Sequence, residues 1–355
     1  LSLSNVGKTE LDIVFTALHG TSIVSVPPAL AKAGFTNVQL VEAQSTPDGN
    51  FPTVASPNPE ESAALAMAIA QAEATNADLV IGCDPDTDRV GIAVNDGTGK
   101  MQLLNGNDTA ALLVHYILDA YKTNGTLPAN GFTAATVVTT DLIADISAAY
   151  GVPCYCCLTG FKWIADIINN KPEEQFLVGG EESYGYLIGD EVRDKDAVAS
   201  AVMIAEMAAN AKAQGRTVLQ QLEAIHREFG QYQERLIAVT KKGRSGAQEI
   251  ADMMTALRND PPKTLAGSPV IIAIDHGKST QTDLLTGATS STELPASNVL
   301  QFITEAGDKV SARPSGTEPK IKFYFSVRAT TGESHAATKA ELERKIDTFI
   351  EELNL

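Results

Sequence analysis

The distribution of hydrophobic residues along the chain predicts successive blocks of structure. From Leu11 onward, short apolar runs typical of buried strands alternate with longer segments typical of helices. In the first block, LDIVFTAL, VQLVEA and ADLVIGC predict strands, and VGIAVND with GTGKMQLLN predicts a hairpin. Two helices are predicted in TSIVSVPPALAKAG and in PEESAALAMAIAQAEATN, the second beginning near Glu60 after a Pro-rich connection.

The second block repeats this rhythm. Strands are predicted in TAATVVTT, VPCYCCL and QFLVGG, and helices from about Asn107 to Ala120 and in DLIADISAAYG, KWIADIINN and DAVASAVMIAEMAANAKAQG. Strands that alternate with helices favour parallel sheets, in which ligands bind beyond the carboxyl ends of the strands. We therefore expect two α/β/α domains in the first two blocks.

The third block differs in order. After the helix TVLQQLEAIHREFG, strands are predicted in ERLIAVT, PVIIAID, VLQFIT, KVSARP and KIKFYFSVR, with helices in GAQEIADMMTALRND and HAATKAELERKIDTFIEEL. This order favours an α+β domain with an antiparallel sheet. Because 355 residues exceed what one core usually holds, we expect three domains, at 1–98, 99–228 and 229–355.

Composition and charge narrow the classes of function that this chain can have. The chain is 44% hydrophobic and 20% charged, with a formal net charge of -17, which is typical of a soluble globular protein and argues against nucleic acid and anionic membrane as partners. An anionic substrate would need local basic groups. The sequence shows neither an apolar run long enough for a membrane span nor a signal-peptide pattern at its start, so we expect a cytoplasmic protein. The four cysteines predict buried free thiols.

Three aspartates follow the strand ADLVIGC directly. In CDPDTDRVG, Asp84, Asp86 and Asp88 stand at alternate positions. Carboxylate oxygens that converge on one point are the ligands that Mg²⁺ prefers, and this loop lies where sites form in α/β sheets. The loop therefore predicts a magnesium site, with a solvated acidic turn as the alternative.

The aspartate loop allows two other interpretations. A calcium-binding EF-hand loop requires Gly at its sixth position and Glu at its twelfth, where this chain has Arg89 and Asn95, so that reading fails. A phosphotransfer site of the haloacid-dehalogenase type remains open, since Asp84 would be its nucleophile and IGDEVRD supplies a later Gly-Asp pair.

A basic turn stands out in this acidic chain. ARPSGTEPKIKFYFSV ends a strand at Arg313 and turns through a Ser, Gly and Thr, and the next strand carries Lys320 and Lys322 on one face. Backbone N–H groups, hydroxyls and a guanidinium together form a plausible phosphate cradle. The alternative is a plain turn beside a solvated lysine face.

Two further loops carry candidate chemistry. GGEESYGYLIG presents Glu181, Glu182 and Ser183 between glycines, which suits the vicinal hydroxyls of a sugar or, equally, helix capping. In LTGFKWI, Lys162 stands between two aromatic residues. Such a lysine either transfers protons with a lowered pKa or extends its stem over an apolar surface.

The order of these motifs resembles that of the α-D-phosphohexomutase family. D-x-D-x-D-R, T-G-F-K, G-E-E-S-Y-G and R-P-S-G-T-E-P-K follow one another between about Phe15 and Phe325, and T-G-F-K with FPTVASPNPEE is most similar to the phosphoglucomutase branch. The resemblance implies a carboxyl-terminal domain similar to the TATA-binding-protein fold. It also implies interconversion of glucose 1-phosphate and glucose 6-phosphate, with glucose 1,6-bisphosphate as activator; a phosphomannomutase or phosphopentomutase of the same family is the alternative.

The resemblance also implies roles for individual residues. It implies that three aspartates hold Mg²⁺ beside a phosphoserine, that Arg89 lies near that phosphate, and that Lys162 transfers protons. The sugar and the substrate phosphate would be bound by Glu181, Ser183, Arg193, Lys195, Arg313, Ser315, Gly316 and Thr317, with His19 and Lys322 as possible neighbours.

One family motif is missing. The serine loop T-A-S-H-N-P does not occur, because ASPNP at 55–59 lacks the histidine and follows a predicted strand of the first block. The chain also starts with Leu rather than Met. We therefore expect a piece of a longer enzyme that is inactive as a mutase by itself, or a non-catalytic module that binds sugar phosphates.

Overall fold

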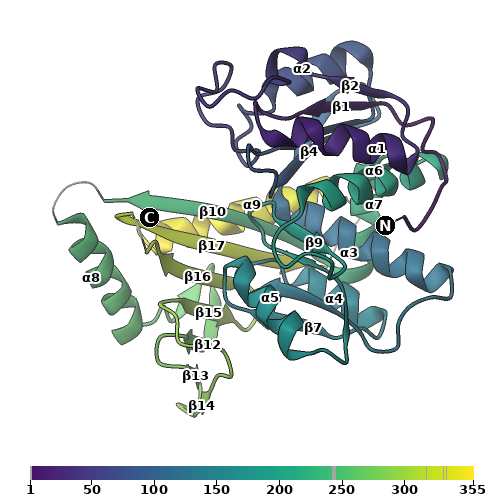
Figure 1. The fold of residues 1–355 in the computed structure, drawn as a ribbon. Helices are drawn as coiled ribbons and strands as arrows, with labels where there is room; N and C mark the ends of the chain where they lie inside the picture. Colours follow the sequence, from purple (N-terminus) through teal and green to yellow (C-terminus); the bar gives the residue numbers. More distant parts are fainter. Residues whose placement is uncertain (1, 242–244, 317, 331, 333) are drawn as a thin grey trace. The chain divides into compact units, whose positions relative to one another are not determined.

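The computed structural model describes residues 2–241, 245–316, 318–330, 332 and 334–355 of the chain (Figure 1). The chain forms two compact units, Leu1–Ile225 and His226–Leu355, called here the amino-terminal and carboxyl-terminal units. Among the described residues, no helix combines the length and the hydrophobicity needed to cross a lipid bilayer.

The first sheet of the amino-terminal unit has the strand order β2-β1-β3-β4-β5. Its first three strands are parallel, and β4 and β5 continue it as antiparallel neighbours. The strands are β1 (Ile13–Thr16), β2 (Val38–Leu40), β3 (Leu79–Cys83), β4 (Val90–Asn95) and β5 (Met101–Leu104). The helices are η1 (Thr21–Val24), α1 (Val26–Ala33), η2 (Glu42–Gln44) and α2 (Ala66–Thr75).

The second sheet of this unit has the order β7-β6-β8-β9, with β9 antiparallel to the three parallel strands. Its strands are β6 (Gly131–Thr136), β7 (Cys154–Cys157), β8 (Gln175–Gly180) and β9 (Tyr186–Ile188). Its helices are α3 (Gly106–Thr123), α4 (Leu142–Ala149), α5 (Phe161–Asn170) and α6 (Ala197–Ala213).

Helix α6 joins the two sheets of the amino-terminal unit. It is buried without a break from Ser200 to Ala209, and it contacts β9 and α3 of the second sheet region and α1, β3 and β4 of the first. A helix without a polar face is stable in water only when it is covered all round. The sequence AVASAVMIAEMAANAKA therefore fixes α6 as the shared core of both sheets.

One charged residue lies inside this core. Glu206 of α6 is fully buried, and its carboxylate pairs with the ammonium of Lys8 at 2.8 Å. The same carboxylate accepts hydrogen bonds from Tyr116 Oη at 3.0 Å and from the backbone N–H groups of Leu3 and Ser4. These partners hold the pKa of Glu206 below its usual range although burial alone would raise it. The network attaches the first residues of the chain to α6.

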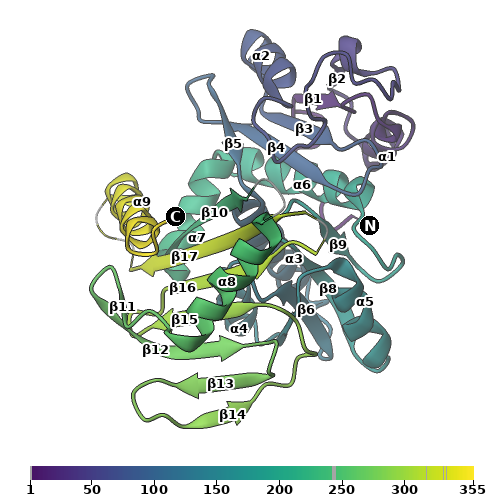
Figure 2. The same cartoon turned by 90° about the vertical axis from the view of Figure 1, so that its left-hand side faces the viewer.

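The carboxyl-terminal unit is built on one antiparallel sheet with the order β10-β17-β16-β15-β12-β13-β14, visible in Figure 2. The strands are β10 (Gln231–Thr240), β11 (Thr264–Leu265), β12 (Ser268–Asp275), β13 (Thr280–Asp283), β14 (Thr289–Ser291), β15 (Leu300–Thr304), β16 (Lys309–Pro314) and β17 (Lys320–Ala329). The helices are α8 (Gly246–Asn259) and α9 (His335–Glu352), and α7 (Val218–Phe229) precedes the sheet.

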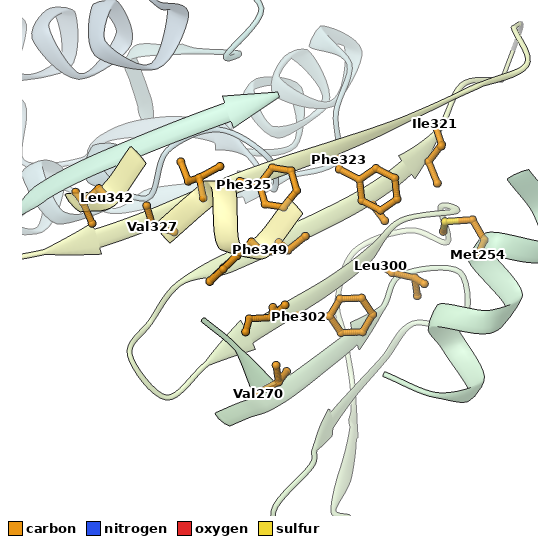
Figure 3. Packing of buried hydrophobic residues seen from close by; sticks show 14 of the residues in the cluster. Met254, Val270, Leu300, Phe302, Ile321, Phe323, Phe325, Val327, Leu342 and Phe349 are labelled. Carbon is orange, nitrogen blue, oxygen red and sulfur yellow. The ribbon is translucent and has the colours of Figure 1, made fainter. Parts of the chain in front are cut away.

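The hydrophobic core of this unit combines residues of the sheet and of both helices. It includes Phe302, Phe323 and Phe325 on the strands, which pack with Met254 of α8 and Phe349 of α9 (Figure 3).

The predicted fold class is confirmed. Two α/β regions, each with three parallel strands in its sheet, precede an α+β unit with an antiparallel sheet. The helix predicted to begin near Glu60 is wrong at its start, because α2 begins at Ala66. Asn58 Oδ1 accepts the N–H of Glu60, and Ser56 donates to Glu61, so local side-chain bonds compete with the helix.

The prediction of buried thiols is wrong for half of the cysteines. All four are free, but only Cys83 and Cys157 are buried, while Cys154 is half-buried and Cys156 is exposed. The reason is the position of β7, which is an edge strand of its sheet. Its alternate side chains point outward, which leaves Cys154 and Cys156 accessible to solvent.

A histidine pair in the carboxyl-terminal unit, with His226 buried and His335 half-buried, predicts a stability that depends on pH. Nδ1 of His226 lies 2.9 Å from Nε2 of His335, and the two rings are stacked. Burial, followed by the charges of His335 and Lys339, lowers the pKa of His226 to about 4. The unfolded chain binds this proton more readily, so the contribution is complete above pH 6.5 and is lost as pH falls toward 4.

We expect His226→Gln to remove this pH dependence. In urea unfolding curves, wild type should lose about 3 kcal/mol more stability than the variant between pH 6.5 and pH 4. Parallel losses in both proteins over this interval would show that His226 does not carry the effect.

Candidate active site

The aspartate loop lies at the carboxyl end of β3, between β3 and β4. The strands position it because β3 (LVIGC) is fully buried and pairs with β4 in register, from Leu79 opposite Val94 to Cys83 opposite Val90. One carboxylate oxygen from each of Asp84, Asp86 and Asp88 falls within 4.8 Å of the other two. The predicted convergence of the three side chains is therefore present.

Asp84 is the buried member of the cluster, with 8% of its surface exposed. Its Oδ1 accepts hydrogen bonds from the backbone N–H groups of Asp88 at 3.0 Å and Arg89 at 2.8 Å, which closes the loop. Burial and the neighbouring carboxylates, opposed by the Arg89 N–H, together raise the pKa of Asp84 to about 7. The cluster concentrates negative charge that a cation would stabilise.

These carboxylates fit a hard divalent cation. The donor set is entirely oxygen, and three carboxylates at one point suit Mg²⁺, which binds through a few carboxylates and retains several waters. Asp86 is exposed and Asp88 half-buried, so solvent reaches one side of the cluster.

Two cations border the aspartate cluster. Arg89 pairs with Glu60, and its Nε lies 3.7 Å from Asp88 Oδ1 and 4.0 Å from Asp84 Oδ2. Lys195 Nζ lies 2.9 Å from Asp88 Oδ2 and is only 14% exposed. A Cβ on Gly185 would collide with the Lys195 side chain, so a larger residue there would displace Lys195. The sequence predicts Lys195 as a substrate contact and gives no sign of its pairing with Asp88.

The turn after β1 supports the same loop. A Cβ on Gly20 would collide with the backbone of Pro85, and Thr21 donates to Pro85 O at 3.0 Å and lies 2.8 Å from the Thr87 hydroxyl. Thr87 itself has a left-handed backbone with φ of 67°. The sequence motif T-A-L-H-G thus packs directly against the aspartate loop.

His19 lies in this turn but is buried, with 4% of its surface exposed. Its Nδ1 faces Thr46 O at 3.2 Å, which can only accept, and its Nε2 lies 2.8 Å from the Thr53 hydroxyl. The hydrogen bonds therefore assign the proton to Nδ1. His19 acts as a structural neighbour of the site.

The two candidate sugar-binding loops are joined to each other. Oε1 of Glu181, which is 6% exposed, accepts the N–H of Gly160 at 2.7 Å, so the T-G-F-K loop rests on the G-E-E-S loop. The ring of Phe161 lies under Lys195, with Nζ 5.4 Å from its centroid. Because Lys195 also pairs with Asp88, its contacts link these loops to the aspartate loop within the amino-terminal unit.

The other predicted residues of this unit are more exposed. Lys162 is exposed, and its Nζ lies 5.0 Å from the centroid of Trp163. Arg193 contacts Asn169 and the carbonyls of the exposed loop that contains Asp190. Among the described residues, the Ser183 hydroxyl and Glu181 Oε2 have no hydrogen-bond partner, so both remain available to a ligand.

The predicted phosphate cradle lies in the carboxyl-terminal unit. Arg313 of β16 and Lys322 of β17 are cross-strand neighbours, and the turn between them is closed by Ser315 N donating to Lys320 O at 2.7 Å. Gly316 is exposed, with open space where a Cβ would stand. Thr317 lies outside the described residues.

Sequence reasoning missed Thr21 and Glu60, and it did not predict the contacts that Thr87 and Phe161 make in the site. Thr87 stands in the quoted loop, but its partner hydroxyl lies 66 residues away. Glu60 was assigned to a helix, and only the pairing with Arg89 reveals it. A single chain offers no signal for such pairings before the fold is known.

Comparison with known proteins identifies the family. Residues 1–97 match the model of phosphoglucomutase/phosphomannomutase α/β/α domain II, and residues 105–229 match domain III. The chain belongs to the α-D-phosphohexomutase family. A phosphoglucomutase from Staphylococcus epidermidis is 38% identical over 92% of this chain, which covers 59% of that relative. The chain thus spans less than two thirds of the length of this relative.

Solved structures share the fold at low sequence identity. The open form of the Paramecium phosphoglucomutase pp63/parafusin matches 98% of this chain and 59% of its own, with a TM-score of 0.68 and 16% identity. N-acetylphosphoglucosamine mutase of Aspergillus fumigatus, solved in complex with GlcNAc-6P and magnesium, matches 97% of this chain and 67% of its own, with a TM-score of 0.52 and 12% identity.

Proposed function

We propose that this chain carries the metal-binding and phosphate-binding parts of a phosphoglucomutase-type enzyme that interconverts glucose 1-phosphate and glucose 6-phosphate. The reaction would pass through a phosphoserine enzyme and a bisphosphorylated sugar, with glucose 1,6-bisphosphate as activator. The observation that carries this proposal is the cluster of Asp84, Asp86 and Asp88 within 4.8 Å, in a chain of the phosphohexomutase family. The domain boundaries at 98 and 228 stay part of the proposal.

The three aspartates would hold Mg²⁺, which also accompanies the sugar phosphate in the Aspergillus structure. When bound, the ion neutralises charge on a phosphoryl group in transfer. Arg89, held in place by Glu60, would contact the same phosphate as a fixed cation. Lys195 offsets the charge of Asp88 and, by our proposal, also reaches the substrate.

The sugar would be bound by the joined loops. Glu181 is fixed through Gly160, which leaves Oε2 to accept from a sugar hydroxyl, and Ser183 offers a hydroxyl beside it. We assign proton transfer to Lys162, and Arg193 is a further proposed contact in the exposed loop. The phosphorylated serine would come from outside residues 1–355.

The substrate's own phosphate would be bound in the carboxyl-terminal unit. Arg313 and Lys322 place two cations on neighbouring strands, and the turn adds the backbone of Ser315 and Gly316. Thr317 completes the proposed set. A net charge of -17 makes such a local basic group the means by which the chain attracts an anionic sugar.

The test is the affinity for glucose 6-phosphate with Mg²⁺ in isothermal titration. We expect Arg313→Gln to weaken binding roughly 10- to 100-fold, because a charge-assisted contact to the phosphate is lost. Arg344→Gln, which removes an exposed arginine on α9, is the matched control and should bind as wild type does. Equal affinities of the two variants would contradict the cradle.

The same samples test whether this chain binds the substrate without catalysing its conversion. We expect these 355 residues to bind glucose 6-phosphate without converting it to glucose 1-phosphate. Because the matched family models cover both phosphoglucomutase and phosphomannomutase, mannose 6-phosphate is titrated in parallel. Tighter binding of mannose 6-phosphate would move the proposal to the mannose branch.

A further inference from the structure

A polar cavity of about 460 Å³ lies in the amino-terminal unit, away from the aspartate loop. Leu11 and Asp78, which line it, stand just before β1 and β3, whereas the aspartates follow the far end of β3. The five residues of β3 place the two edges of the sheet roughly 17 Å apart. The cavity is therefore separate from the proposed active site.

One wall of this cavity is the edge of the first sheet. Asn95 Oδ1 accepts the N–H groups of Gly97 at 2.9 Å and Gly99 at 3.2 Å, which shapes the hairpin between β4 and β5. Asp78 Oδ2 accepts from Asp12 N at 2.8 Å and pairs with Lys212 Nζ at 2.7 Å, so its negative charge is balanced. This wall offers no uncompensated negative charge to repel an anion.

The other wall is the connection from α6 to α7, two helices that Figure 2 labels. Thr217 and Gln220 close the start of α7 reciprocally: Thr217 N donates to Gln220 Oε1 at 3.0 Å, and Gln220 N donates to Thr217 Oγ1 at 3.2 Å. The hydroxyl proton of Thr217 is left to donate. The positive end of the α7 dipole lies at the same place.

The uncompensated group in this cavity is a cation. Within the part of the chain that the structure describes, the guanidinium of Arg216 has neither an ion pair nor a hydrogen bond. In a chain of net charge -17, a guanidinium without a carboxylate partner beside a helix start favours an anion. The side-chain amide of Asn76 in the opposite wall adds donor and acceptor capacity suited to hydroxyls.

We propose that this cavity is a binding site for a small organic phosphate that also carries hydroxyl groups. The phosphate contacts Arg216 and the start of α7, and the hydroxyls contact Asn76 and the hairpin wall. The volume of the cavity lies within the range of small-molecule sites, and the guanidinium of Arg216 provides the bidentate geometry that phosphate prefers. The inference does not depend on the proposed mutase activity.

The test uses glycerol 3-phosphate as the probe, titrated calorimetrically into the chain carrying Arg313→Gln, which removes the main contact of the other phosphate site. We expect one binding event, weakened at least roughly tenfold by adding Arg216→Gln and unchanged by adding Arg344→Gln. Because Arg216 is exposed, the substitution should leave the urea unfolding curve unaltered. The ligand should also raise the melting temperature of every protein except the Arg216→Gln variant.

Inorganic phosphate and glycerol serve as partial probes. We expect inorganic phosphate to bind more weakly than glycerol 3-phosphate, and glycerol alone to give no heat of binding. The proposal is overturned if Arg216→Gln and Arg344→Gln bind alike, or if the Arg313→Gln chain does not bind glycerol 3-phosphate. Equal affinities for inorganic phosphate and glycerol 3-phosphate would overturn the assignment of an organic ligand.

Discussion

Glu206→Ala is expected to lower the free energy of unfolding of the amino-terminal unit by about 3–5 kcal/mol. The substitution leaves the buried ammonium of Lys8 without its counter-charge and removes the acceptor of the Leu3 and Ser4 N–H groups. Unpaired buried charges and donors are among the largest single-residue penalties known. Urea unfolding followed by circular dichroism measures the loss.

A double variant separates the charge from the packing. Replacing both partners, as in Lys8→Met with Glu206→Met, leaves no unpaired charge, so it should cost less than Glu206→Ala alone. Lys100→Met at the exposed pair with Glu73 is the control and should change stability by less than 1 kcal/mol. A loss below 1 kcal/mol for Glu206→Ala would contradict the assigned role of this network.

Asp86→Asn is expected to weaken divalent cation binding by roughly 100-fold or more, since one full ligand charge is removed at contact distance. Asp86 is the cleanest position for this test, because it is exposed and the loop is closed by Asp84. Its replacement should therefore leave the fold unchanged. Mn²⁺ titration followed by electron paramagnetic resonance measures the free ion directly.

The control for this measurement is Asp252→Asn, which removes the same charge from the exposed surface of α8. It should bind Mn²⁺ as wild type does. If Asp86→Asn and wild type bind Mn²⁺ with equal affinity, the three carboxylates do not form a metal site, and the acidic turn is a solvated surface feature.

Local sequence patterns predicted much of the fold. Buried strands such as LVIGC are continuous apolar runs, and amphipathic helices such as α9 show the helical spacing of apolar residues. The short polar strands β13 and β14 were missed, since TQTD and TSS carry no apolar signal. They form because β13 pairs with β12 and β14 pairs with β13, a tertiary effect that propensity does not contain.

The candidate site, like the fold, could be predicted from the sequence only in part. The convergence of Asp84, Asp86 and Asp88 follows from their spacing in one loop, and the structure confirms that they cluster. The pairing of Lys195 with Asp88 and of Glu60 with Arg89 joins segments from different parts of the chain. Such contacts depend on how α6 and the two sheets pack, so the local sequence around each residue could not reveal them.

The central claim is that Asp84 is a metal ligand of a phosphohexomutase rather than a phosphorylated nucleophile. The most direct test incubates the complete protein with glucose 1,6-bisphosphate labelled with ³²P and treats the product with neutral hydroxylamine, which cleaves acyl phosphates but not serine phosphates. We predict label that resists hydroxylamine and no label on Asp84. A hydroxylamine-sensitive phosphate mapped to Asp84 would contradict the account.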